Sequence, residues 1–137
     1  TGRVERAQIL AGYDTLETPE AINADAQIGA VVAGDWIASD LVAGAVSDNA
    51  FFGDGDDDPI SEVGEALGID SRIASIVIKG TALGTIVGGD HFGFVAQRIG
   101  SLKIGTTKLP LLTGSATDLA GLDVGITGDL RIREIAL

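Results

Sequence analysis

A short hydrophobic pattern recurs along the chain, and it is typical of half-buried strands. Three runs share a template of Ile, a small residue, Ala or Ser, an aliphatic residue, any residue, an aliphatic residue and then Gly. They are Ile28-Gly-Ala-Val-Val-Ala-Gly34, Ile73-Ala-Ser-Ile-Val-Ile-Lys-Gly80 and Ile99-Gly-Ser-Leu-Lys-Ile-Gly105. Apolar and polar residues alternate in Leu102-Lys103-Ile104, as on a strand with one buried face. The glycine after each run predicts a turn.

The spacing of these runs predicts a repeat architecture. Weaker matches to the template are Val4–Gly12 and Asp129–Ile135. Equivalent positions lie 24 residues apart from Val4 to Ile28, 26 from Ile73 to Ile99 and 28 from Leu102 to Leu130. The step from Ile28 to Ile73 is 45 residues, which corresponds to two units or to one unit with an insertion. Repeats of strand and turn that stack to share a core form a solenoid. We therefore predict an all-β fold, a parallel β-solenoid (β-helix) of short strands with one acidic loop insertion, and keep an antiparallel β-sandwich as the alternative.

Other strands, and one helix, are expected between the runs. The further short strands are Trp36–Val42, Leu83–Val87, Phe92–Ala96 and Lys108–Leu112. A short helix is expected over Ile60–Leu67, between Pro59 and Gly68. Thr15–Ala26 is expected to be a loop. No stretch rich in Pro or Ser divides the chain, so residues 1–137 are expected to form a single β-repeat domain.

The amino-acid composition indicates which residue types form the core and which classes of partner are excluded. Hydrophobic residues make up 45% of the chain but aromatic residues only 4%, so the core is expected to consist of Ile, Val, Leu and Ala. Cys is absent, which excludes disulfides and thiolate metal sites. The net charge of −11 argues against nucleic acid and anionic membranes, and no apolar stretch is long enough for membrane insertion. Because the chain starts at Thr1, we expect a processed product or an excised segment, with any targeting signal upstream.

An acidic segment over residues 47–59 is the clearest candidate for metal binding. Its carboxylate and amide side chains alternate with glycines, and calcium prefers six to eight such oxygen ligands. The candidate ligands are Asp48, Asn49, Asp54, Asp56, Asp57 and Asp58. Pro59 stands where an EF-hand loop requires Gly, so the segment belongs to no standard class of calcium loop, and a solvated acidic turn is the alternative. Phe51 and Phe52 are expected to anchor the segment on the core.

Catalytic candidates are few. His91, beside Asp90, is the single histidine, and it is interpreted as a structural turn residue because no nucleophile motif accompanies it. Arg72, Arg98 and Lys103 could act as bases of a polysaccharide lyase, although the sequence does not group them. Trp36 and Tyr13 could line a carbohydrate platform, but a place for Trp36 in the core is preferred. The sequence therefore favours a protein that is not an enzyme and leaves catalytic residues unassigned.

Several motifs together resemble a known kind of protein. They are Ile9–Asp14, Asn23–Gly29, Gly34–Gly44, Phe51–Asp57, Lys79–Gly84 and Asp90–Ala96. Across residues 9–135 the chain resembles a segment of very large, repeat-rich, adhesin-like surface or secreted proteins of bacteria. The resemblance implies β-solenoid repeats, calcium loops and a secreted or cell-surface location.

These observations lead to one functional expectation and two alternatives. We expect an extracellular structural or adhesive module that is stabilised by calcium. Residues 1–70 carry a net charge of −13 and residues 71–137 of +2, so copies of the chain or of its parent protein are expected to self-assemble head to tail. The alternatives are a carbohydrate-binding module, which would bind a polysaccharide through exposed aromatic residues, and a polysaccharide-active enzyme, which would need Asp90, His91 and Arg98 in one cleft.

Overall fold

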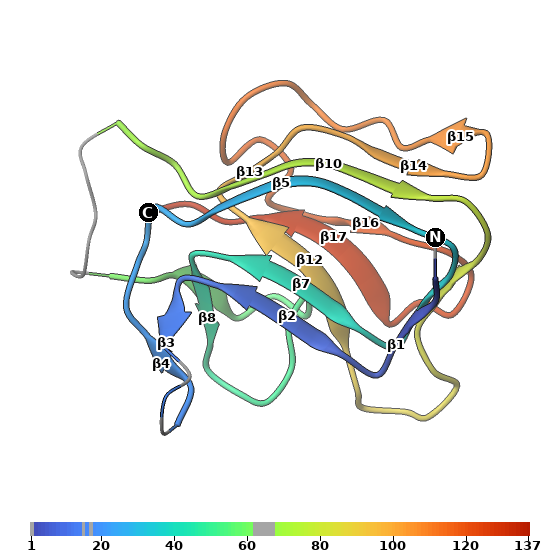
Figure 1. The fold of residues 1–137 in the computed structure, drawn as a ribbon, viewed down its shortest axis with the longest axis horizontal. Helices are drawn as coiled ribbons and strands as arrows, with labels where there is room; N and C mark the ends of the chain where they lie inside the picture. Colours follow the sequence, from blue (N-terminus) through green and yellow to red (C-terminus); the bar gives the residue numbers. More distant parts are fainter. Residues whose placement is uncertain (1, 15, 17, 62–67) are drawn as a thin grey trace.

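The fold consists of strands arranged in several sheets (Figure 1). The structure is a computed structural model, and it describes residues 2–14, 16, 18–61 and 68–137. The all-β prediction is confirmed, because no helix is present in these residues. It follows that the described part of the chain contains no helix long and apolar enough to span a membrane. The expected helix over Ile60–Leu67 falls mostly on residues 62–67, outside the described residues, and Ile60 itself is buried and non-helical.

Three sheets contain most of the strands, and their pairings are mainly parallel. The first sheet comprises β1 (Val4–Glu5), β6 (Trp36–Ile37) and β11 (Ala82–Leu83), in that order and all parallel. The second comprises β2 (Gln8–Ala11), β7 (Asp40–Ala43), β12 (Phe92–Ala96), β17 (Leu130–Glu134) and the antiparallel β16 (Leu122–Asp123). The third comprises β5 (Gln27–Ala33), β10 (Arg72–Ile78), β13 (Arg98–Ile99), β14 (Leu102–Ile104) and the antiparallel β15 (Thr107–Lys108). Parallel pairing of the long strands differs from the antiparallel pairing that a sandwich would require.

Two short hairpins complete the fold. They are β3 (Tyr13–Asp14) with β4 (Glu20–Ala21), and β8 (Ala45–Ser47) with β9 (Asp57–Pro59). The segment Thr15–Ala26, expected to be a loop, therefore includes the strand β4. The β8–β9 hairpin is the acidic segment of the sequence, and it is inserted between β7 and β10.

The three strongest sequence runs are neighbours in the third sheet. Ile73 pairs in register with Ile28 on one side and with Ile99 on the other. The 45-residue step from Ile28 to Ile73 is thus one unit with an insertion, because the two residues lie on adjacent strands. In Figure 1, β5 and β10 run side by side with β14 beyond them.

The prediction that the two weaker runs stack on the Ile28 run is wrong. Val4 pairs with Trp36 in the first sheet, and Leu130 pairs with Phe92 in the second, so neither run stacks on the Ile28 run. Period-two alternation shows that a segment is a strand but carries no information about which sheet it joins, and this explains the error. Two expected strands are also shorter than predicted: β11 ends at Leu83, and β15 ends at Lys108.

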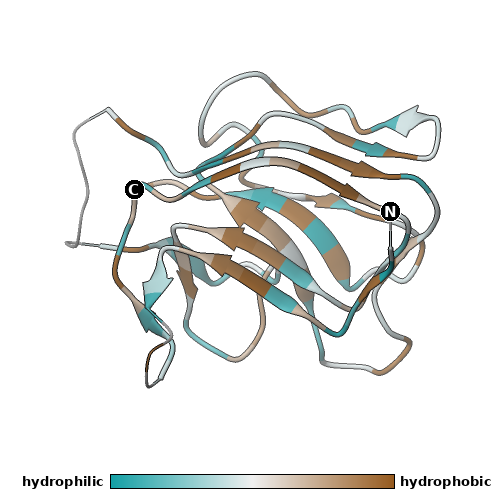
Figure 2. Cartoon of the chain, in the orientation of Figure 1, coloured by the Kyte–Doolittle hydropathy of each residue, from teal (hydrophilic) through white to brown (hydrophobic). Residues whose placement is uncertain are grey.

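The main core lies between the sheets and is built from small aliphatic residues around one aromatic pair. Trp36 and Phe94 are fully buried, with ring centroids 5.1 Å apart. The aliphatic members Leu41, Ile73 and Ile76 are also fully buried. Figure 2 shows hydrophobic and hydrophilic positions alternating along β17, whereas β2 and β7 are hydrophobic after their first residue.

Candidate functional site

The β8–β9 hairpin is held over the outer face of the second sheet by a small apolar cluster. Val42 and Val95 point away from the main core, because they alternate with the inward-facing Leu41 and Phe94. Phe52 packs on this outer face and is 7% exposed. The expectation of an apolar anchor is therefore confirmed for Phe52, which packs in a second cluster distinct from the main core. Phe51 is only partly buried and belongs to neither cluster. We call the second cluster the outer cluster: Val42, Ala45, Phe52, Val95 and Ile135.

Further contacts fix the hairpin in place. The Tyr13 hydroxyl donates a hydrogen bond to the Ala45 carbonyl at 2.7 Å. At Gly53 the backbone has a φ of 88°, and a Cβ there would lie 2.7 Å from the Phe92 carbonyl oxygen. Only glycine combines this left-handed conformation with so close an approach. The loop between β8 and β9 is thus pressed against the start of β12.

Three of the six candidate ligands come together. Oxygens of Asp54, Asp56 and Asp57 lie within 4.8 Å of one another. Asn49 joins them through its Nδ2, which donates to Asp54 Oδ2 at 2.7 Å and to Asp56 Oδ2 at 2.6 Å. We call Asn49, Asp54, Asp56 and Asp57 the acidic cluster.

The two remaining candidates lie outside this cluster. Asp58 follows Asp57 on β9 and is exposed, because successive strand residues point to opposite faces. Asp48 is exposed on the loop. The alternation of carboxylates in the sequence identified the segment, but the paired geometry of the hairpin selects which of them converge.

Asp57 is the buried member of the acidic cluster. It is 4% exposed, and its Oδ2 accepts a hydrogen bond from the Gly53 amide at 2.7 Å. Its Oδ1 is buried and has no hydrogen-bond partner in the described part of the chain. Burial raises the pKa of Asp57 to about 7, and the charges of Asp54 and Asp56 act in the same direction against the Gly53 hydrogen bond.

The two outer carboxyl groups differ in acidity. The pKa of Asp56 is raised, first by its hydrogen bond with Asp54, then by burial and by the charge of Asp54. Burial also acts to raise the pKa of Asp54, but hydrogen bonds from Asn49 and Asp56 outweigh it and the pKa falls. The cluster therefore holds a proton readily, and a cation could replace that proton.

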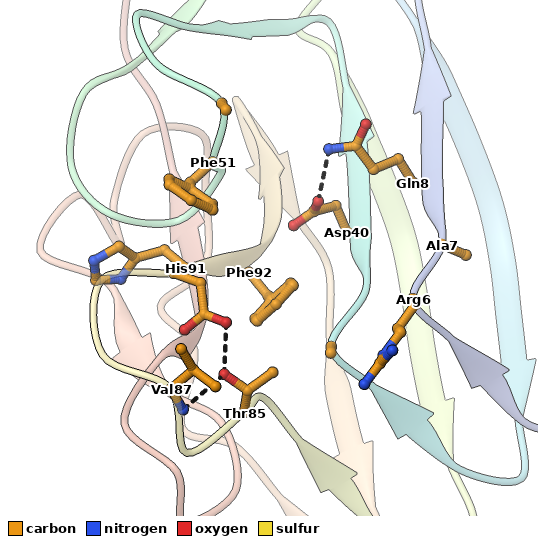
Figure 3. Close-up of a pocket in the computed structure, with 12 residues that line it drawn as sticks. Arg6, Ala7, Gln8, Asp40, Phe51, Thr85, Val87, His91 and Phe92 are labelled. Atoms are coloured by element: carbon orange, nitrogen blue, oxygen red, sulfur yellow. Dashed lines mark hydrogen bonds between the residues drawn. The ribbon is translucent and has the colours of Figure 1, made fainter.

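A pocket of about 400 Å³ adjoins the hairpin (Figure 3). Phe51 and His91 form part of its wall, with ring centroids 6.3 Å apart. Asp90 accepts a hydrogen bond from the Thr85 hydroxyl at 2.6 Å, which fixes one carboxylate on the wall. Arg6 lines the opposite side, so the pocket combines aromatic, acidic and basic groups.

A second carboxylate on the pocket wall has a structural role. Asp40 is 4% exposed; it accepts from Gln8 Nε2 at 3.1 Å and from the Gly93 amide at 2.9 Å. Burial raises its pKa, while these two hydrogen bonds act to lower it. Asp40 thus links β2, β7 and β12 at the start of these strands.

The catalytic candidates from the sequence do not form one cleft. Asp90 and His91 line the pocket beside the hairpin, whereas Arg98 lines a separate pocket with Lys108. Arg98 pairs in register with Arg72 in the third sheet, so the structure brings together two of the three proposed lyase bases. Lys103 lies on β14, opposite Val77. The cleft that would have favoured a polysaccharide-active enzyme, joining Asp90, His91 and Arg98, is absent from the described residues.

The aromatic candidates for carbohydrate binding are also separated. Trp36 is fully buried, and its Nε1 donates to the Ser39 carbonyl at 2.9 Å. It therefore belongs to the core, as preferred from the sequence, and cannot serve on an exposed platform. Tyr13 is half-buried beside the β8–β9 hairpin.

Comparisons with known proteins add no relative. The chain matches no protein-family model, no curated protein and no solved structure.

Proposed function

We propose that this chain is a calcium-stabilised β-solenoid module that serves a structural or adhesive role on an extracellular surface. The observation that carries the proposal is the order in which the chain visits its three sheets. It runs through β1, β2 and β5, then through β6, β7 and β10, and then through β11, β12 and β13 with β14. Each passage thus adds one parallel strand to each sheet, which is the way a solenoid grows.

The side chains that stack from one passage to the next support this architecture. Ile28, Ile73 and Ile99 occupy one register position, and Val31, Ile76 and Leu102 another. Both sets face the main core. A strand of this kind buries its aliphatic face only when neighbouring strands cover it, so the passages stabilise one another.

The acidic cluster supports the calcium part of the proposal. Its three carboxylates offer up to six oxygens, and Asp57 Oδ1 is a buried oxygen that lacks a partner in the described chain. Calcium takes six to eight oxygen ligands, some of them from water. Without a cation, the three carboxylates repel one another unless one of them holds a proton.

The kind of site and the resemblance to bacterial surface proteins support the proposed extracellular location. Asp54 and Asp56 remain partly exposed, and the calcium sites of extracellular modules bind the cation at about 0.1 to 1 mM. A module without cysteine would rely on the cation rather than on a disulfide to fix its longest described hairpin loop.

A small carbohydrate ligand is the second candidate, and the pocket beside the hairpin favours it. Phe51 and Phe92 offer ring surfaces there, and Asp90 and Arg6 offer polar groups, which is the usual composition of a site for a polar small molecule. Titration of the protein with oligosaccharides, followed by amide chemical shifts at Asp90 and Phe92, would test this candidate.

The calcium proposal is tested by thermal unfolding with calcium, with magnesium and with a chelator. We expect calcium to raise the unfolding midpoint, because a ligand that binds only the folded state stabilises it. D57N should abolish this increase. D58N is the matched control: it makes the same chemical change one residue away, on the exposed face of β9, and should retain the increase. An unchanged midpoint in the wild-type protein, or equal responses of D57N and D58N, would remove calcium from the function.

A further inference from the structure

Asn49 is the member of the acidic cluster whose side-chain amide holds two of the carboxylates together. Its Nδ2 donates to Asp54 Oδ2 at 2.7 Å and to Asp56 Oδ2 at 2.6 Å. Its Oδ1 accepts a hydrogen bond from the Phe51 backbone amide at 2.6 Å. These partners fix the orientation of the side-chain amide, because a backbone N–H needs an acceptor and a carboxylate needs a donor. Asn49 therefore turns its nitrogen, and not its oxygen, toward the carboxylates.

The Asn49 amide nitrogen lies where a bridging cation would have to lie. Calcium binds its oxygen ligands at about 2.3 to 2.6 Å, and the nitrogen has nearly this separation from one oxygen of Asp54 and one of Asp56. The side-chain amide nitrogen of asparagine is a hydrogen-bond donor and offers no lone pair to a cation. The Asn49 amide and a cation that bridges these two oxygens thus exclude each other.

Phe51 connects Asn49 to the pocket beside the hairpin. Its backbone amide is held by Asn49, and its side chain lines the pocket with the ring edge-on to His91 (Figure 3). Phe51 belongs to neither apolar cluster, whereas the next residue, Phe52, is anchored in the outer cluster. A movement of the Asn49 side chain would therefore be taken up over residues 49–51, which include this part of the pocket wall.

We propose that Asn49 is a built-in substitute for the cation, and that cation binding displaces its side chain, releases Phe51 and so regulates the pocket. This inference rests on the proposed cation site. In the cation-free protein, two charge-assisted hydrogen bonds from Asn49 offset the repulsion between Asp54 and Asp56. A cation bound by these carboxylates takes over that role. The amide then turns away as a whole, and its oxygen no longer holds the Phe51 backbone.

The coupling between the two sites acts in both directions. If a cation in the acidic cluster changes the affinity of the pocket for a ligand that contacts Phe51, that ligand changes the affinity for the cation by the same factor. The occupancy of the pocket would thus depend on the calcium concentration around the protein.

The calcium affinity of N49S, measured by titration calorimetry on the full chain, tests the displacement. Serine keeps an oxygen that can accept the hydrogen bond from the Phe51 amide, but it has no amide nitrogen for the carboxylates. Because the cation no longer has to break hydrogen bonds to charged groups, N49S should bind calcium roughly tenfold more tightly than the wild-type protein. If Asn49 were a ligand, N49S would bind calcium more weakly, and equal or weaker binding would overturn the proposal.

N23S is the matched control. Asn23 Oδ1 accepts a hydrogen bond from the Asp25 amide at 2.9 Å, in the same two-residue turn that Asn49 forms with Phe51. Asn23 lies outside the acidic cluster, so N23S should keep the wild-type affinity for calcium. An equal gain in N23S would show that the effect does not come from the carboxylates, and it would overturn the proposal.

The ring contact between Phe51 and His91 tests the link to the pocket. His91 is the single histidine of the chain, so its ring protons have an unambiguous assignment by nuclear magnetic resonance. We expect a nuclear Overhauser effect between the two rings in chelator and a loss of most of its intensity at saturating calcium. D57N should keep the full intensity when calcium is added. An unchanged ring contact in the calcium-saturated wild-type protein would overturn the link.

The measurements separate this inference from the calcium proposal on which it rests. If calcium raises the unfolding midpoint but N49S binds it no more tightly, the displacement of Asn49 is wrong and the calcium proposal stands. If neither the wild-type protein nor N49S binds calcium, both are wrong.

Discussion

The second sheet has an apolar cluster on each face, and the two clusters are stabilised in different ways. The inner face carries Leu41, Phe94 and Ile132 into the main core, where they are enclosed by the other sheets. The outer face carries Val42 and Val95 into the outer cluster, which is covered by a single hairpin. The inner cluster therefore depends on burial alone. The stability of the outer cluster depends also on the charge state of the hairpin. Phe52 lies in the β8–β9 loop and the buried Asp57 lies on β9, so both residues belong to the same hairpin.

This difference implies that solution conditions should act on one side of the sheet only. Hydrophobic burial responds weakly to pH and to divalent cations, whereas clustered carboxylates respond strongly to both. Substitutions on the two faces should separate these contributions.

The largest effect is expected on the inner face. F94A removes a fully buried ring that contacts Trp36, and it should lower the free energy of unfolding by roughly 3 to 5 kcal/mol. Urea unfolding measures this loss. The loss should be the same with calcium and with chelator, and a cation-dependent loss would contradict the separation of the two faces.

The second-largest effect is expected from pH, which should change the free energy of unfolding through Asp57. The pKa of Asp57 is about 7 in the folded protein and close to 4 in the unfolded chain, so the folded state binds the additional proton between these values. Without a cation, the free energy of unfolding should fall as pH rises from about 4 to about 7, by roughly 2 to 4 kcal/mol, and level off above.

Two variants sharpen this measurement. D57N cannot ionise, so its stability should change less over the same pH range, while D58N should follow the wild-type protein. Calcium should reduce the fall in the wild-type protein, because the cation takes the place of the proton. Equal pH profiles for D57N and D58N would contradict the assignment to Asp57.

F52A should have the smallest effect on global stability of these three changes. It removes one ring from the outer cluster, and a loss of about 2 to 3 kcal/mol is expected, because the hairpin can settle into the space. The same variant should weaken the calcium-induced increase of the unfolding midpoint, because it releases the loop that carries Asp54 and Asp56. A full calcium response in F52A would show that the acidic cluster forms without its apolar anchor.

The sequence by itself determined the β class, the register of Ile28, Ile73 and Ile99, and the acidic segment. These features depend on local order, since alternation sets which side chains share a face and glycine sets where a strand ends. Tertiary structure alone decided that Val4 and Leu130 join other sheets and that Asp54, Asp56 and Asp57 converge without Asp58. These features depend on where distant segments meet, and the loops that bring them together leave no periodic signal in the chain.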